Sequence, residues 1–291
     1  MRYYTDSDSL FIRGAFRAAS TGIAGGMRNV TTLFNHTVPA NWDHAAPEKE
    51  IERVAAAAGT GTDVLGLLTA VPIHNLCVLQ YDFITVFVTA GIRKKPADTG
   101  TINVIVYSSE GLEDSALLET IMVVAEAKTE AMLALDLVSG TPTDAVITAC
   151  EGEIIHRYAG RVTDAGQRVR DAVIKGVTEA LHRFEREMQP SQPAFFIYSR
   201  FEGGHWVEWS SVNCPYYPCH FPGQNCDFCY CPFYPCRDET LGKWSPSSSN
   251  GRVWNCSSCT LLHEPAVAEY LKQYPDAPLE ELVRFRKRLK K

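Results

Sequence analysis

Cysteine is distributed very unevenly along this chain. Eight of the 10 cysteines in the 291-residue sequence lie between Cys214 and Cys259. Cys226 and Cys229 are separated by two residues, as are Cys256 and Cys259, and this spacing lets both sulfur atoms of a pair reach one tetrahedral metal ion. The sequence therefore predicts a small metal-stabilised domain that is distinct from the larger N-terminal part.

The cysteine-rich segment contains an internal repeat. Cys214–Cys219 and Cys231–Cys236 share the pattern Cys-Pro-aromatic-Tyr-Pro-Cys, which offers two thiolates on a proline-stiffened loop. Eight thiolates fill two structural zinc sites, and zinc is favoured over an iron–sulfur cluster or disulfides. His220 or His263 could replace one cysteine, and the partition of the ligands stays open. The predicted metal ligands are Cys214, Cys219, Cys226, Cys229, Cys231, Cys236, Cys256 and Cys259.

Composition narrows the class of protein. The formal charge of -6 and the pI near 5.8 argue against a nucleic-acid binder, because neutralising phosphates requires a basic face. We find no apolar core of a secretory signal at the N-terminus and no run long enough to cross a membrane, so we expect a cytoplasmic protein. The density of cysteine also fits metal ligation in a reducing compartment.

A change in composition suggests the domain boundary. Pro190 and Pro193 flank a short polar segment that is typical of a linker. We expect one domain over residues 1–190 and a cysteine-rich zinc-binding domain over residues 191–291. The second domain ends in a basic helical tail, which is usually just solvated and less often contacts a partner.

The N-terminal part alternates between strand-like and helix-like segments. Apolar, β-branched runs bounded by Gly or Pro predict strands at 64–71, 83–89, 102–107 and 145–150. Helical periodicity is present at 48–58, 112–137 and 165–188. The fold class is therefore α/β, in the form of a mixed α+β sandwich.

Polar residues interrupt the predicted buried segments. If residues 91–100 form the loop of an antiparallel hairpin, Thr89 and Gly91 lie beside Thr101 and Asn103. A crossover through the long helix brings the Thr141–Asp144 segment to the same rim, provided that the flanking strands are parallel. Because a buried polar group without a partner costs a few kcal/mol, this convergence predicts a binding site.

Two charged residues on the long helix point in different directions. Glu126 and Lys128 are two positions apart, about 200° around the axis, so they cannot face one atom. Lys128 shares the stripe of Val124 and Met132 and is the more unexpected of the two. It either binds a negative group or acts as a base, or it belongs to a structural ion pair.

Two further features lie near the N-terminus. The glycine-rich segment 20–29 lacks the lysine and the spacing of a phosphate-binding loop, so a tight turn is favoured over a ligand loop. Asn35 and His36 follow a predicted strand at 30–34 and can both donate and accept hydrogen bonds. We add both residues to the candidate substrate-binding set.

Taken in order, these motifs resemble the adenosylcobinamide amidohydrolase family, CbiZ. The resemblance covers about Leu10 to Leu181 and rests on segments that are specific only as a series. They are Asn35, Thr89–Gly91, Gly100–Asn103, Glu126–Lys128 and Gly140–Asp144. The second domain resembles a cysteine-rich module of methanogenic archaea.

The resemblance implies a hydrolase that cleaves the aminopropanol amide of adenosylcobinamide and gives adenosylcobyric acid for cobamide salvage. Cobalt then belongs to the corrinoid substrate and is not a cofactor. The catalytic candidates are Asn103, Glu126, Lys128, Thr143 and Asp144. The substrate-binding candidates are Asn35, His36, Thr89, Gly91, Thr101 and Thr141.

Several mechanisms fit these residues. Asp144 or Glu126 could activate water, Asn103 and Asn35 could stabilise the oxyanion, and Lys128 could protonate the leaving amine. The rival scheme uses Thr101 or Thr143 as nucleophile. Cys77 and Cys150 are interpreted as core residues.

A different function would use the same pocket without chemistry. The alternative is a non-catalytic corrinoid-binding or delivery protein whose cysteine-rich domain docks onto a protein partner. A weaker reading makes that domain a nucleic-acid binder, which the acidic charge disfavours. The sequence does not indicate an oligomeric state.

Overall fold

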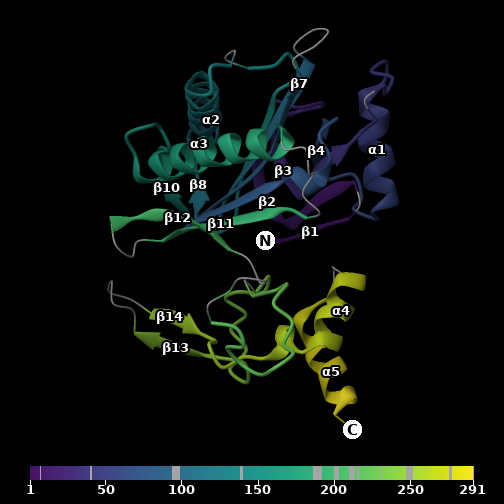
Figure 1. The fold of residues 1–291 in the computed structure, drawn as a ribbon, viewed down its shortest axis with the longest axis vertical. Helices are drawn as coiled ribbons and strands as arrows, with labels where there is room; N and C mark the ends of the chain where they lie inside the picture. The colour runs from purple at the N-terminus through teal and green to yellow at the C-terminus, as the bar shows by residue number, and fades with distance from the viewer. Residues whose placement is uncertain are drawn as a thin grey trace. The chain divides into compact units, whose positions relative to one another are not determined.

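The computed structural model describes two compact units, Tyr3–Trp209 and Ser210–Lys291 (Figure 1). The residues it describes are 1–6, 8–39, 41–93, 99–137, 140–185, 192–199, 203–209, 214, 216–229, 231–246, 252–274 and 277–290. Each unit has its own hydrophobic core, as an independent domain requires.

The first unit is built on one large mixed sheet. Its strands are β1 (Arg2–Thr5), β2 (Ser9–Ser20), β3 (Gly26–Thr37), β4 (Val64–Thr69), β5 (Cys77–Tyr81), β6 (Ile84–Arg93), β7 (Thr99–Ser108), β9 (Ala145–Cys150), β11 (Ala194–Ser199) and β12 (His205–Trp209). A separate short pair is formed by β8 (Gly111–Leu112) and β10 (Ile154–His156). The helices are α1 (Pro47–Ala57), α2 (Asp114–Ala134) and α3 (Asp164–Glu185), with the 3₁₀ turn η1 (Ile73–Asn75).

The strand order is β12-β11-β5-β6-β7-β9-β2-β3-β4, with β1 beside β2. β6 and β7 form the predicted antiparallel hairpin, in which Thr89 is opposite Asn103 and Gly91 is opposite Thr101. β7 and β9 are parallel and are joined through α2, as the crossover argument requires. The α/β fold class predicted from the sequence is confirmed.

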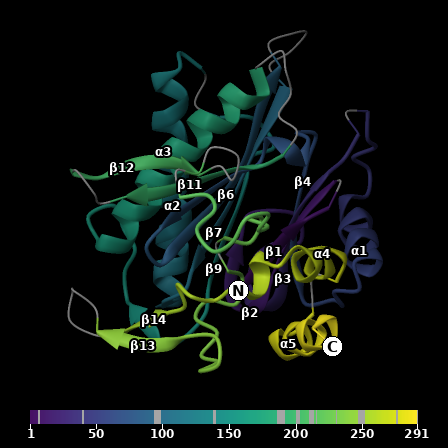
Figure 2. The same ribbon diagram turned by 60° about the horizontal axis from the view of Figure 1, so that its bottom comes forward.

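One face of the sheet is covered by α2 and α3, which lie on the same side of the strands in Figures 1 and 2. Alternate residues of β6 and β7, such as Val88 and Val104, pack there against Val124 of α2 and Val173 of α3. This is the period-two pattern of a strand that meets a helix layer. It accounts for the apolar residues on the side of α2 that faces the sheet.

The other face of the sheet curls onto itself. Leu33 of β3 and Ile105 of β7 belong to one core, although β9 and β2 lie between their strands. Neighbouring residues of β3 point outward instead, so Phe34 packs under α1. The curled inner face is therefore enclosed by strands from both ends of the sheet.

The first unit extends past the predicted boundary at residue 190. β11 pairs in parallel with β5, and β12 pairs in antiparallel with β11, so both strands belong to the sheet of the first unit. Ala194 and Phe196 pack into the core beneath α3. The segment 186–191, which includes Pro190 of the predicted linker, lies outside the described residues.

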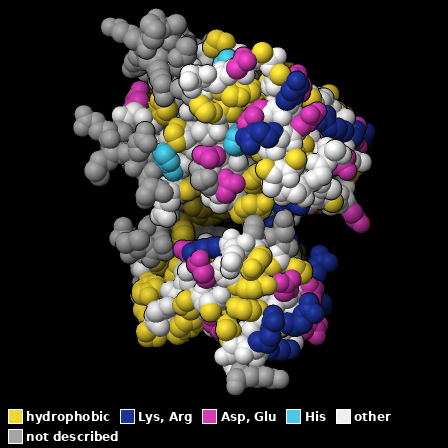
Figure 3. All heavy atoms as spheres, turned by 90° about the vertical axis from the view of Figure 1, so that its right-hand side faces the viewer, with side chains coloured by type: hydrophobic (Ala, Val, Ile, Leu, Met, Phe, Trp, Pro, Cys, Tyr) yellow, Lys and Arg dark blue, Asp and Glu magenta, His cyan; other side chains and the backbone are white. Residues whose placement is uncertain are grey.

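The second unit is small. Its elements are β13 (Lys243–Pro246), β14 (Arg252–Asn255), the 3₁₀ turn η3 (Leu261–His263), α4 (Pro265–Gln273) and α5 (Leu279–Leu289). Leu261, Val267 and Leu282 form its core, with Cys231, Cys236 and Cys259 packed against them. The last turn of α5 is basic, and Figure 3 shows Lys and Arg side chains gathered on this unit. Across the described residues, we find no helix that is long and apolar enough to span a membrane.

Candidate active site

A chain of buried amides lies at one end of the curled inner face. Along β7 the inward residues change from Tyr107 and Ile105 to Asn103 and Thr101. The Nδ2 of Asn103 donates to Oδ1 of Asn35 at 2.9 Å, and Nδ2 of Asn35 donates to Oγ1 of Thr89 at 2.8 Å. Side-chain hydrogen bonds thus join β3 to the β6–β7 hairpin, which lies more than 50 residues later in the sequence.

One side-chain atom of Asn103 has no hydrogen-bond partner in the described structure. Its Nδ2 also donates to the Leu68 carbonyl at 3.0 Å, whereas its Oδ1 is buried and has no protein partner in the described structure. An unpaired buried acceptor costs about 1–3 kcal/mol. An orphaned oxygen of this kind can accept a hydrogen bond from a ligand or from water.

Two threonines lie beside this amide chain. The Oγ1 of Thr143 donates to the Gly100 carbonyl at 2.9 Å and is also 2.9 Å from Oγ1 of Thr101. A hydroxyl has a single proton, so Thr101 must be the donor in the contact between the two threonines. The lone pairs of Thr101 Oγ1 therefore remain available.

Asp144 connects the loop before β9 to the start of β7. Its Oδ1 accepts from the Ile102 amide at 2.9 Å and from the Thr141 hydroxyl at 2.6 Å. Its Oδ2 accepts from the Thr141 amide at 2.9 Å and from Lys128 Nζ at 2.5 Å. These four donors occupy the positions at which a carboxylate accepts, an arrangement that suits a residue holding strands in register.

Lys128 reaches Asp144 from α2 and is largely shielded from solvent, with side-chain exposures of 15% for Lys128 and 12% for Asp144. Gly140 permits this approach. A Cβ at that position would lie 2.7 Å from Lys128 Nζ and 2.9 Å from Asp144 Oδ2. The structural ion pair considered for Lys128 is present.

Three sequence candidates add no side-chain contact to this cluster. Glu126 is exposed on the outer side of α2, away from Lys128, as the helical angle predicts. Gly91 is a packing position, since a Cβ there would meet Phe184 at 2.7 Å. His36 follows Asn35 by one residue, so it points to the opposite face of β3, toward α1.

The surroundings of His36 were not anticipated. The Nδ1 of His36 contacts Ser9 Oγ at 2.8 Å, and its Nε2 lies 3.4 Å from Glu50 Oε1. Burial lowers the pKa of His36 and outweighs the opposing effect of Glu50. Glu50 is also bound by Arg53, and this hydrogen bond lowers the pKa of Glu50. Nothing in the sequence pattern around Ser9 or Glu50 indicates that these residues contact His36.

The cysteines of the second unit sit on short turns. In each turn, the carbonyl of a cysteine accepts a hydrogen bond from the backbone amide three residues later. The accepting cysteines are Cys214, Cys226, Cys231 and Cys256. None of the eight forms a disulfide in the described structure. In the part of the chain that the structure describes, no three His, Cys, Asp or Glu side chains are arranged to hold a metal ion.

Gln224 links two of these thiols. Its Nε2 lies 3.2 Å from Sγ of Cys219 and 3.2 Å from Sγ of Cys226, and the residue is buried. Burial raises the pKa of Cys229, and the thiols of Cys226, Cys219 and Cys214 raise it further. Burial likewise raises the pKa of Cys231 to about 12, with Cys259, Cys236 and Cys256 as its thiol neighbours. Cys229 and Cys231 thus each have three other thiols in their surroundings, and the two sets of three do not overlap.

The fold and the buried polar cluster define the first unit as an α/β domain with hydrogen-bonded polar side chains in its interior, joined to a small cysteine-rich unit. Residues 9–189 match the family model of adenosylcobinamide amidohydrolase, and residues 205–286 match that of the cysteine-rich small domain. The chain belongs to the adenosylcobinamide amidohydrolase family.

Two similar proteins bear the name of this family, and a third, with a different name, matches a shorter stretch of the chain. An adenosylcobinamide amidohydrolase of Methanosarcina mazei is 39% identical over 197 residues, covering 62% of this chain and 98% of that protein. One from Halobacterium salinarum is 30% identical over 184 residues, covering 57% of this chain and 80% of the relative. A probable cobalt-factor III C(17)-methyltransferase of Methanothermobacter thermautotrophicus is 50% identical over 62 residues, covering 21% of this chain and 17% of that protein.

Proposed function

We propose that this protein hydrolyses the amide that joins aminopropanol to the corrin ring of adenosylcobinamide, and so gives adenosylcobyric acid for cobamide salvage. The observation that carries the proposal is the match to the Methanosarcina protein of that name, which extends over 98% of the relative's length. Cobalt enters only as part of the substrate.

We place the reaction beside Asn103 and the two threonines. The Oδ1 of Asn103 is an acceptor without a partner, and it would receive an N–H or O–H of the substrate. Thr101 retains free lone pairs and is the better placed of the two threonines to act as nucleophile, with water as the rival. Thr89 and Asn35 orient Asn103, and Thr141 orients Asp144.

Lys128 is assigned the protonation of the leaving amine. Its ammonium group has three protons, and the structure gives it one carboxylate acceptor, Asp144. Asp144 holds Lys128 in place while it anchors the start of β7. Glu126 has no part in this scheme, because it is exposed on the other side of α2.

The test is direct. Purified protein is incubated anaerobically with adenosylcobinamide, and released aminopropanol is measured by mass spectrometry. Asn103→Ala should lower kcat/KM by about 100-fold or more, the usual effect of losing a polar contact to the reacting group. Asn29→Ala is the matched control, since Asn29 is an exposed asparagine on β3. Tight binding of unchanged ligand would instead indicate a corrinoid-delivery protein.

We also propose that the cysteine-rich unit holds two structural zinc ions. The gathered thiols suggest one set of Cys214, Cys219, Cys226 and Cys229, and another of Cys231, Cys236, Cys256 and Cys259. Support comes from the four turns and from the Gln224 amide, whose two contacts with sulfur suit thiolates. Closed sets of four sulfur ligands stabilise a fold and leave no open position for catalysis.

Metal analysis tests the zinc proposal. The full chain should contain two zinc ions per molecule, and Cys219→Ser and Cys236→Ser should each remove a different ion. The buried Cys77→Ser variant is the control and should retain both ions. A chain that contains iron with acid-labile sulfide would contradict zinc. We propose a cytoplasmic location, because clustered cysteines that ligate a metal ion are typical of a reducing compartment.

A further inference from the structure

One face of α2 is apolar and uncovered. Leu118, Met122 and Leu133 expose 52%, 63% and 59% of their surface. Their spacing places them on one stripe of the helix, together with the smaller Ala125 and Thr129. The opposite side of α2 is buried against the sheet, so this helix is apolar on two sides while only one has a partner within the first unit.

The stripe continues onto the neighbouring segment. Tyr158 and Val162 are 59% and 88% exposed. The backbone amides of Ala159 and Gly160 donate to Oε2 of Glu119 at 2.6 and 2.9 Å, which fixes this segment against α2. Apart from Val207, every exposed large hydrophobic side chain described in the first unit lies on α2 or in residues 154–162. We call this surface the α2 face.

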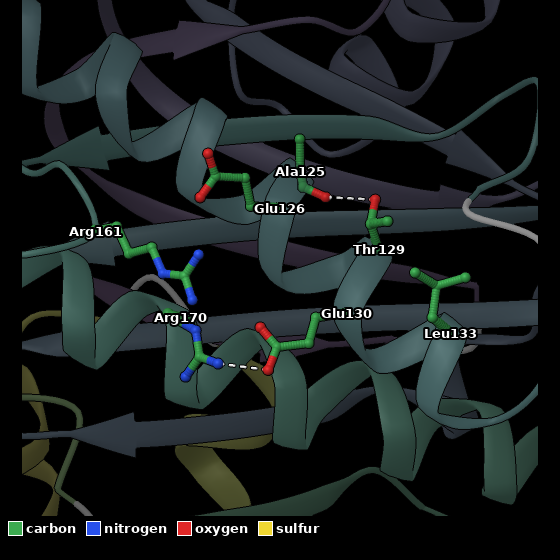
Figure 4. Close-up of a pocket in the computed structure, with 7 residues that line it drawn as sticks. All are labelled: Ala125, Glu126, Thr129, Glu130, Leu133, Arg161 and Arg170. Atoms are coloured by element: carbon green, nitrogen blue, oxygen red, sulfur yellow. Dashed lines mark hydrogen bonds and ion pairs between the residues drawn. The ribbon is translucent and has the colours of Figure 1, made fainter.

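Charges of both signs lie next to the α2 face. A hollow of about 590 Å³ is lined by α2 together with Arg161 and Arg170 (Figure 4). Arg170 pairs with Glu130 at 2.5 Å. The carboxylate of Glu126 and the guanidinium of Arg161 both border the hollow, and no ion pair within the described structure engages either of them. The face thus presents one acidic and one basic group that can be paired from outside.

We propose that the α2 face is the interface between two copies of this chain. A monomer rarely exposes a concentrated apolar surface, and a two-fold axis makes any patch meet itself. With the α2 helices antiparallel, the small side chains of Ala125 and Thr129 allow close approach at the centre. Arg161 of each copy then meets Glu126 of the other. The balanced charge disfavours an anionic membrane surface or a nucleic acid as the occupant.

Sedimentation equilibrium of the full chain tests this proposal. The wild-type protein should form a dimer, and Met122→Lys should raise the dissociation constant roughly 30-fold or more, as truncating a central apolar contact does. Val207→Lys is the matched control, because Val207 is an exposed hydrophobic residue of the same unit outside the α2 face. Circular dichroism verifies that each variant is folded.

Mixing two single variants identifies the ion pair. Arg161→Glu alone places two acids opposite each other, and Glu126→Arg alone places two bases opposite each other, so each should dissociate. In an equimolar mixture both contacts become acid with base, and a heterodimer should form. A monomeric wild-type protein, or a dimer that survives Met122→Lys, would overturn the proposal. Failure of the mixture to associate would overturn the antiparallel arrangement. Neither result depends on the proposed amidohydrolase activity.

Discussion

The contact between Lys128 and Asp144 allows a quantitative prediction. At 2.5 Å and an effective dielectric constant of about 20, the gross attraction is about 7 kcal/mol, and desolvation of the two groups offsets much of it. Removing one partner strands the other charge, which costs about 3–5 kcal/mol. Lys128→Met should therefore lower the free energy of unfolding of the first unit by about 3 kcal/mol. This value is the lower end of that range, because both side chains keep some exposure to solvent.

Thermal unfolding followed by circular dichroism measures this loss. For a unit of this size, about 3 kcal/mol corresponds to a Tm that is lower by about 6–12 °C. Lys49→Met on α1 is the control, since Lys49 is an exposed lysine, and it should change stability by less than about 0.5 kcal/mol. Lys128 is also the proposed acid, so the kcat of Lys128→Met is compared with that of the wild-type protein at a temperature well below the Tm, where both are folded.

A double-mutant cycle decides whether the two residues act as a pair. Lys128→Met and Asp144→Asn together leave neither charge stranded, so the combined loss should be smaller than the sum by about 2 kcal/mol. If the two losses simply add, or if each is below about 1 kcal/mol, the reasoning about a shielded ion pair is wrong.

Three further predictions follow from the same geometry. The pKa of His36 is lower in the folded state than in the unfolded state, so the unfolded chain binds more protons. The stability that neutral His36 contributes is therefore complete above a pH of about 6.5 and is lost as the pH falls. His36→Gln should make the free energy of unfolding depend less on pH in acid unfolding curves. Thr101→Ala should abolish turnover if Thr101 is the nucleophile, whereas Thr101→Ser should retain part of it, and equal kcat losses in the two variants would favour water. Cys150→Ser should leave kcat unchanged at neutral pH, since burial raises the pKa of this thiol, and a large loss would show that the core interpretation is wrong.

Much of the site could be predicted because it follows from local rules. The hairpin loop fixes Thr89 opposite Asn103, and the right-handed crossover brings Asp144 beside Ile102. Period-two alternation would also have separated His36 from Asn35, so the sequence held this signal. The contact of Asn35 with Asn103 could not be derived, because it depends on the curl of the whole sheet.

The end of the first unit likewise could not be predicted from local sequence patterns. Pro190 and Pro193 resemble a linker, and the sequence does not say that the strand after them returns to the sheet. β11 pairs with β5, which is more than 100 residues earlier, and no local pattern reports a pairing over such a distance. The opposite directions of Glu126 and Lys128 on α2 could be predicted, because the angle per residue of a helix fixes them.

The parallel pairing of β11 with β5 has a practical consequence for dissecting the protein. A chain cut at residue 190 would lose both terminal strands and leave the backbone amides and carbonyls of β5 bare along one border of the sheet. Such a border attracts strands from other molecules and invites aggregation. An N-terminal fragment that stops after Trp209 keeps that border closed, and it should stay dispersed where the shorter fragment precipitates.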